Sequence, residues 1–95
     1  MWTTWSDGEI LKSPLSLYEK RLELLWELKK RGFYVRMHAY EYLIGDGDKF
    51  KALIFLEPEL ERAILKILDD SVVETRKAIE EVLFNIDPGI RVEVI

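Results

Sequence analysis

Few side chains in this 95-residue sequence could carry out catalysis. The single histidine, His38, lies within a segment of strand propensity, and its expected role is packing or hydrogen bonding rather than proton transfer. None of the four serines lies in a Gly-x-Ser-x-Gly sequence, the elbow that exposes a nucleophilic serine. Without cysteine the chain has no thiol nucleophile and no thiolate metal site, and one histidine is too few for a zinc site. The sequence therefore predicts no catalytic residue, no metal and no cofactor.

The segment Gly45-Asp46-Gly47-Asp48 has the composition of a ligand-binding loop, but its spacing fits none. A dinucleotide-binding loop needs a third glycine where Phe50 stands, with a helix after it. A calcium loop of the EF-hand type needs further oxygen ligands and a glutamate at its twelfth position. Asp-Gly flanked by apolar segments is instead typical of a two-residue β-hairpin turn. We interpret these four residues as the tip of a hairpin.

Asp48 and Glu57 are the two acids that a metal-dependent nuclease could use. The order of a helix, a strand starting near Phe33, an acidic turn and a strand ending at Glu57 distantly resembles the core of restriction-endonuclease-like enzymes. That resemblance implies Mg²⁺ held by acidic residues, but the family's Glu-x-Lys sequence is replaced here by Glu57-Pro58-Glu59. The alternative role of Glu57 is an ion pair with Arg36 across a strand ladder. A nuclease is thus a remote alternative.

Composition narrows the class of protein further. Apolar residues make up 48% and charged residues 34% of the chain, which excludes a disordered or collagen-like chain. With 18 acidic and 14 basic residues the formal net charge is −4, and an acidic domain is a poor general binder of nucleic acid because phosphate neutralisation supplies most of that binding energy. No apolar run approaches the roughly 20 residues of a membrane helix, and the first five residues lack the pattern of a signal peptide. We therefore expect a globular, cytoplasmic domain with no membrane partner.

The balance of residue types also predicts a heat-stable protein. The sequence contains no glutamine or cysteine and one asparagine, Asn85, while Glu, Lys, Arg, Leu and Ile are abundant. Depletion of heat-labile residues together with enrichment in charge is typical of thermophiles.

Turn and capping signals divide the chain into elements. Ser13-Pro14 predicts the start of a helix that ends near Arg31, before Gly32. Pro58 predicts a second helical region with a break at Asp69-Asp70-Ser71, giving helices near 58–69 and 72–85. Alternating apolar residues after Pro88-Gly89 predict a short strand at 90–95.

Two long apolar segments predict a hairpin of 33–44 with 49–57. A turn centred on Asp46-Gly47 pairs Ile44 with Lys49. If Trp2–Trp5 forms a further strand, the order is β-α-β-β-α-β, the ferredoxin-like arrangement, with an antiparallel sheet and helices on one face. If it is a loop, a near variant with three strands results. In both cases we expect one α+β domain.

Strand alternation in this hairpin predicts two faces. The expected core face comprises Val35, Met37, Ala39, Leu43, Phe50, Ala52, Ile54 and Leu56. The opposite, mixed face comprises Tyr34, Arg36, His38, Tyr40, Tyr42, Lys51, Leu53 and Phe55. Glu41 interrupts the core face, and we expect it in solvent near the hairpin tip rather than buried.

The mixed face is the candidate binding site. Aromatic and cationic side chains on an open sheet are similar to the surface of RNA-recognition domains, where bases stack on the rings, although no RNA-recognition signature is present. Tyrosine, arginine and histidine also suit a protein interface. The acidic net charge favours the second interpretation, so we expect a non-catalytic binding or assembly module, either a homo-oligomer or bound to a protein partner. Specific binding of single-stranded nucleic acid is the alternative.

Overall fold

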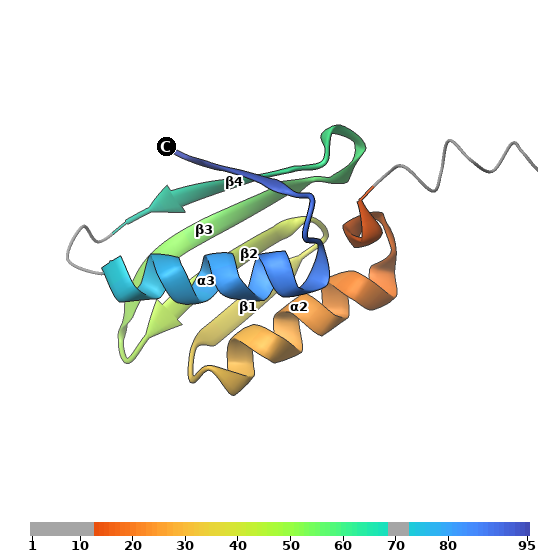
Figure 1. The fold of residues 1–95 in the computed structure, drawn as a ribbon. Helices are drawn as coiled ribbons and strands as arrows, with labels where there is room; N and C mark the ends of the chain where they lie inside the picture. The colour runs from red at the N-terminus through yellow and green to blue at the C-terminus, as the bar shows by residue number, and fades with distance from the viewer. Residues whose placement is uncertain (1–12, 69–72) are drawn as a thin grey trace, which may run out of the picture.

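The computed structural model describes residues 13–68 and 73–95. These residues form two helices and a five-stranded mixed sheet, which confirms the α+β class (Figure 1). The elements are η1 (Pro14–Ser16), α2 (Tyr18–Lys30), β1 (Tyr34–His38), β2 (Glu41–Asp46), β3 (Lys49–Glu57), η2 (Pro58–Leu60), β4 (Arg62–Ile67), α3 (Val73–Ile86) and β5 (Arg91–Val94). The possible strand at Trp2–Trp5 and the expected helix break at Asp69-Asp70-Ser71 lie outside the described residues.

The predicted ferredoxin-like arrangement is wrong. The strands lie in the order β1-β2-β3-β4-β5. The first four form an antiparallel meander, and β5 pairs with β4 in parallel after the chain has passed through α3. A ferredoxin-like sheet would require a helix between its first two strands, whereas here only short turns connect the strands of the meander.

The first helical region begins where the sequence indicates but is divided. The Ser13 hydroxyl accepts a hydrogen bond from the Leu15 amide at 3.1 Å and so caps η1. Leu17 then has an extended backbone, which interrupts the helix, and α2 starts at Tyr18. At the other end Gly32 adopts a φ of 95°, the left-handed conformation that ends helices.

The expected single strand over 33–44 is wrong, because it folds into two strands. His38 pairs with Glu41 across a two-residue turn made of Ala39 and Tyr40. Ala39 adopts a φ of 57° there, a conformation that residues other than glycine adopt infrequently. Because the alternation of side chains starts again after the turn, Tyr42 faces the helices and Leu43 faces away from them, the reverse of the prediction.

The second hairpin turn occurs at Gly47-Asp48, one residue later than expected. Asp46 pairs with Lys49, and Gly47 has a φ of 69°. A bulge next to Gly45 then shifts the register, so that Ile44 pairs with Ala52 and not with Lys49 as predicted.

The expected helix over 58–69 is wrong as well. Pro58–Leu60 forms one 3₁₀ turn, Glu61 reverses the chain with a φ of 53°, and β4 follows. Apolar residues at Leu60, Ile64 and Leu68 fit a helical period, but Ala63, Leu65 and Ile67 alternate equally well as a strand. The helix at 73–86 and the strand at 91–94 agree with the prediction, since each of their four boundaries lies one residue from the predicted one.

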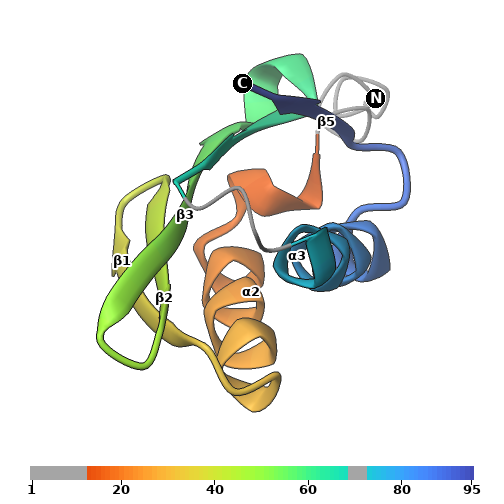
Figure 2. The same ribbon diagram turned by 90° about the vertical axis from the view of Figure 1, so that its left-hand side faces the viewer.

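Both helices lie on the same side of the sheet, as Figure 2 shows. The core lies between these two layers and consists of Leu15, Leu24, Leu28, Val35, Tyr42, Ile44, Ala52, Ile54, Leu56, Ala63, Leu65, Ile79, Val82, Leu83, Ile86 and Ile90. Within the described chain nothing packs on the other side of the sheet. Neither α2 nor α3 combines the length and the apolar character that crossing a membrane would require.

Replacement of Gly45 by alanine should lower the free energy of unfolding by about 1–2 kcal/mol, because it overpacks a rigid contact. A Cβ atom at this position would lie 2.9 Å from the Lys49 carbonyl oxygen and 3.3 Å from the Phe50 ring. Urea denaturation followed by circular dichroism measures the change. Gly89→Ala is the matched control, since a Cβ there meets Asp87 at an ordinary 3.7 Å. Equal losses in the two variants would contradict the bulge geometry.

Candidate functional site

The uncovered side of the sheet is the candidate site, and we call it the open sheet face. Strand alternation and the observed register place its residues in rows that run across the strands. It comprises Tyr34, Arg36, His38, Glu41, Leu43, Gly45, Phe50, Leu53, Phe55, Glu57, Arg62, Ile64, Lys66, Arg91 and Glu93.

The centre of the open sheet face is apolar. Leu43 pairs with Leu53 across β2 and β3, and Phe55 pairs with Ile64 across β3 and β4. All four side chains are half-buried although no helix covers them, because they pack on one another in adjacent rows. A contiguous apolar patch on an otherwise polar surface marks an interaction site more often than a solvated face.

Charged side chains surround this centre. Arg36 and Lys66 occupy the two ends of the row that contains Leu43 and Leu53, whereas Glu41 and Glu93 belong to the neighbouring row. Within the described residues, the side chains of Arg36, Glu41 and Lys66 form no ion pair or hydrogen bond. Their charges are therefore available to a partner.

A hollow of about 350 Å³ opens beside these charges at the β1 edge of the face. It is lined by Arg36, Met37, His38, Glu41, Leu43 and Leu53. The hollow combines aliphatic walls with one cation, one anion and one imidazole, so it could receive a side chain that carries both apolar and charged parts.

One ion-pair network on the open sheet face is already satisfied. The Arg62 guanidinium donates to Glu57 at 2.6 Å and to Glu93 at 3.4 Å. The hydrogen bond to Glu57 is the main reason why the pKa of Arg62 is raised. The expected pair of Glu57 with Arg36 is therefore wrong, since Arg36 lies opposite Leu43 instead.

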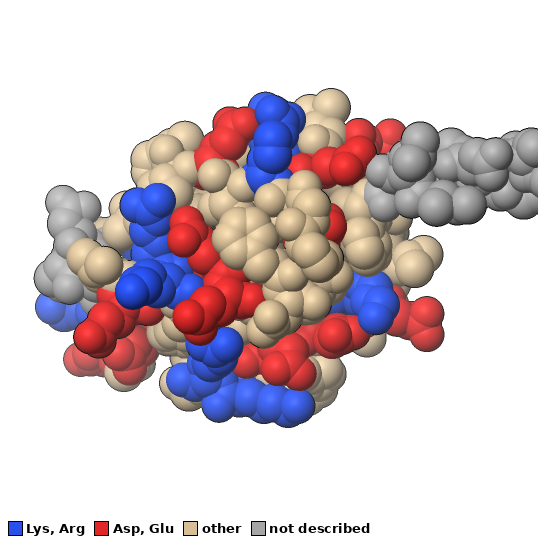
Figure 3. All heavy atoms as spheres, in the orientation of Figure 1, with Lys and Arg blue, Asp and Glu red and all other residues tan. Residues whose placement is uncertain are grey.

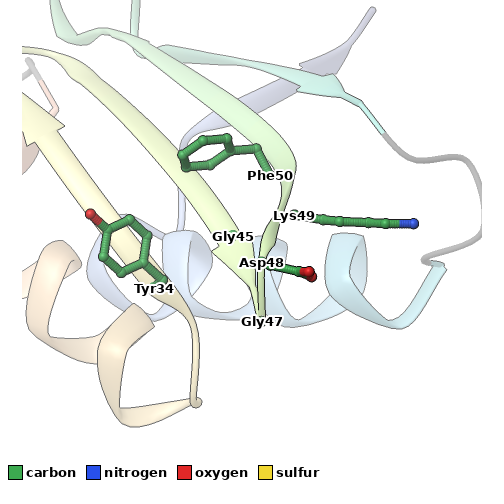
Figure 4. Close-up of a pocket in the computed structure, with 6 residues that line it drawn as sticks. All are labelled: Tyr34, Gly45, Gly47, Asp48, Lys49 and Phe50. Atoms are coloured by element: carbon green, nitrogen blue, oxygen red, sulfur yellow. The ribbon is translucent and has the colours of Figure 1, made fainter.

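At the other end of the face, two aromatic rings flank a glycine. Tyr34, Gly45 and Phe50 lie in one row, and the two ring centroids are 6.3 Å apart with planes tilted by 50°. A hollow of about 220 Å³ lies beside the two rings. Figure 4 shows the side chains of Asp48 and Lys49 pointing away from the rings, so the backbone of the hairpin forms the bottom of this hollow. The rings cover the strand backbone that glycine leaves bare, which is a common way of stabilising a glycine within a sheet.

The structure brings together only some of the predicted site residues. Tyr34, Arg36, His38 and Phe55 lie on the open sheet face, together with Leu53 from the mixed face described above. Lys51 lies at the bulge and is half-buried.

Tyr40 and Tyr42 lie elsewhere. Tyr40 is in the β1–β2 turn, where the Arg21 guanidinium stacks on its ring at 4.2 Å. Tyr42 is fully buried on the helix side, and its hydroxyl donates to the Arg21 carbonyl oxygen at 2.8 Å. Burial raises the pKa of Tyr42 far above its ordinary value, and the nearby Arg21 charge opposes this only in part. The expectation that Tyr42 belongs to the mixed face is wrong, because the turn at Ala39 reverses the alternation.

The two acids of the nuclease hypothesis lie far apart. Asp48 precedes β3 and Glu57 ends it, so the length of a nine-residue strand separates them by roughly 30 Å. Within residues 13–68 and 73–95, no three His, Asp or Glu side chains are close enough to hold one metal ion. Glu41 is exposed, as predicted, but it lies beside His38 on the open sheet face and not at the tip of the β2–β3 hairpin.

Several residues of the open sheet face were not expected there from the sequence: Leu43, Phe50, Ile64, Lys66 and Glu93. Leu43 and Phe50 were expected in the core, and Ile64 and Lys66 in a helix. Alternation within Arg62–Ile67 is the signal that identifies the last two, since it places apolar residues on one face and charged residues mainly on the other.

No family model, no curated protein and no solved structure matches the chain.

Proposed function

We propose that this chain is a non-catalytic, cytoplasmic protein-binding module that acts through the open sheet face. The observation that carries the proposal is the arrangement of that face, with half-buried Leu43, Leu53, Phe55 and Ile64 at its centre and charged side chains around them. Protein interfaces have this organisation, because a fully desolvated apolar centre supplies the binding energy while the polar rim supplies specificity.

Single-stranded nucleic acid is the second candidate partner, and the composition of the centre argues against it. Bases stack on flat rings, but Leu43, Leu53 and Ile64 offer none. The rings of Tyr34 and Phe50 are tilted by 50° to each other with centroids 6.3 Å apart, so they do not form the parallel pair between which a base stacks. The carboxylates of Glu41 and Glu93 on the same face would repel phosphate.

The helix side of the molecule gives nucleic acid no better site. On the face viewed in Figure 3, basic and acidic side chains of the described residues are interspersed, and no continuous basic stripe runs across it. Together with a formal net charge of −4, this distribution provides no strong positive field to attract a polyanion.

Leu53→Lys should weaken association through the open sheet face, because it places a charge at the centre of the apolar patch. Light scattering over a concentration series measures the absolute mass of the unmodified protein and of the variant. We expect a mass above that of the monomer for the unmodified protein, unchanged by short single-stranded RNA or DNA, and a dissociation constant at least about tenfold weaker for Leu53→Lys, which corresponds to about 1.4 kcal/mol.

The matched control is Leu60→Lys, which makes the same change at an exposed leucine in η2, away from the open sheet face. It should leave the mass unchanged, and circular dichroism should show that both variants fold. A monomer at high micromolar concentration that gains the mass of an oligonucleotide would overturn the proposal in favour of nucleic acid.

A further inference from the structure

The charges on the open sheet face are arranged so that this face can complement a second copy of itself. We infer that two copies pack face to face around a two-fold axis that crosses the strands at roughly a right angle. The axis runs between two rows of side chains, one that contains Arg36 and one that contains Glu41. This inference rests on the proposed function, because it takes the open sheet face to be a protein interface.

Two neighbouring rows define the geometry. The first row runs Arg36, Leu43, Leu53, Lys66 from β1 to β4. The second row runs His38, Glu41, Phe55, Ile64, Glu93 from β1 to β5. Because successive side chains on one face are two residues apart, the rows are separated by about 7 Å. Among the described residues, the two cations of the first row form no ion pair, and this row has no acid. The second row contains both acids, of which Glu41 forms no ion pair and Glu93 already accepts a hydrogen bond from Arg62 at 3.4 Å.

If the two-fold axis runs parallel to the rows, the first row of one copy faces the second row of its partner, and the second row faces the first. Each strand then lies over the same strand of the second copy, running in the opposite direction. Arg36 then lies over the partner's His38 and beside the partner's Glu41, and Lys66 lies over the partner's Ile64 and beside the partner's Glu93. In the centre, Leu53 lies over the partner's Phe55 and Leu43 lies over the partner's Glu41. Two-fold symmetry repeats each contact, so the apolar centre is flanked by four pairs of opposite charge.

Rotation about an axis parallel to the strands gives the opposite result. It exchanges β1 with β4, so that each row faces the same row of the partner. Arg36 would then lie directly over the partner's Lys66. Like charges placed opposite each other disfavour this packing. The charge pattern thus selects one of the two face-to-face arrangements, in line with the near-aligned packing that stacked sheets adopt.

Charge reversal in separate chains tests this geometry. In Arg36→Glu, carboxylates of the two copies oppose each other, and in Glu41→Arg, cations do. Each variant alone should dimerise at least about tenfold more weakly than the unmodified protein. An equimolar mixture should form a heterodimer of nearly the original affinity. One chain then carries acids at positions 36 and 41 and the other carries cations at both, so position 36 of each chain meets the opposite charge at position 41 of the other.

Native mass spectrometry distinguishes the heterodimer from both homodimers, since the two variants differ in mass. Mixing cannot repair a contact within one chain, so recovery in the mixture reports contacts between copies. Lys77→Glu, a charge reversal on the exposed surface of α3, is the matched control and should leave association unchanged.

The outcomes separate the two claims. Recovery of dimer in the mixture supports the two-fold arrangement. An unmodified protein that dimerises, with variants that the mixture does not rescue, would overturn the two-fold arrangement and leave the binding function standing. An unmodified protein that stays monomeric to high micromolar concentration would overturn the inference of a second copy, whereas the proposed function is overturned only if that monomer also gains the mass of an oligonucleotide.

Discussion

Tyr42→Ala should lower the free energy of unfolding by about 3–5 kcal/mol, the range for removing a large aromatic side chain from a protein core. The Tyr42 ring is fully buried between the sheet and α2, so truncation leaves a cavity that the surrounding strands can fill only in part. The variant also loses the hydrogen bond from the hydroxyl to the Arg21 carbonyl oxygen. Urea denaturation monitored by circular dichroism measures the loss.

Tyr34→Ala provides the comparison, because it makes the same chemical change on the open sheet face. Tyr34 is 54% exposed and its ring contact is with Phe50, so its truncation should cost less than about 1 kcal/mol. Similar losses in the two variants would contradict the assignment of Tyr42 to the core, and with it the turn at Ala39.

Raising the pH from 9 to 11 should lower the stability of the unmodified protein by about 1.4 kcal/mol through Tyr42 alone. Burial raises the pKa of Tyr42 in the folded state, whereas in the unfolded state the phenol titrates near pH 10. Above that pH the unfolded chain releases a proton that the folded chain retains. The contribution of Tyr42 is therefore complete below about pH 10 and declines as the pH rises further.

Tyr42→Phe isolates this effect, since it keeps the ring and removes the titrating hydroxyl. The free energy of unfolding is measured for both proteins at pH 9 and at pH 11. The change between the two pH values in the unmodified protein, minus the same change in Tyr42→Phe, is the contribution of the Tyr42 hydroxyl. Lysine deprotonation and the growing negative charge affect both proteins equally and cancel. An unchanged difference between the proteins over this range would show that the hydroxyl is accessible to solvent.

The elements that the sequence predicts best are those with local signals. Ser13 as a cap, Gly32 as a helix terminator and the apolar period of α3 each act over a few residues, and each occurs in the structure. Alternation in β3 also places Ala52, Ile54 and Leu56 in the core as predicted, because the strand is continuous there.

The turn at Ala39 carries no such signal. Two-residue hairpin turns favour glycine, asparagine or aspartate, and His38-Ala39-Tyr40-Glu41 contains none in the turn itself. The pairing of β1 with β2, which buries Val35 and Tyr42 against the helices, compensates for the unfavourable φ of Ala39. One unrecognised turn reverses the face of every later residue of the segment 33–44, so Tyr40 and Tyr42 were wrongly included in the candidate site and Leu43 was left out of it.

The prediction of a helix in the segment 58–67 is wrong for a different reason. Its apolar residues satisfy a helical and a strand period at once, and local sequence does not decide between them. The decision comes from distant residues: β3 lies on one side of β4 and β5 on the other, so the backbone groups on both sides of the strand find hydrogen-bond partners. Since Ile64 and Lys66 reach the open sheet face only through β4, this part of the site could not be predicted from the sequence.

The strand order also determines the sequence of events by which the sheet can assemble. Strands β1 to β4 are joined by connections of two to four residues, whose closure costs little chain entropy and is fast. Strand β5 reaches β4 only through the connection that contains α3, so this closure spans more of the chain and should be slower. In a chain whose first four strands have paired and whose fifth has not, β4 would be an exposed edge, open to pairing with another chain. Arg62 and Lys66 on that strand are charged side chains of the kind that discourages such edge-to-edge aggregation.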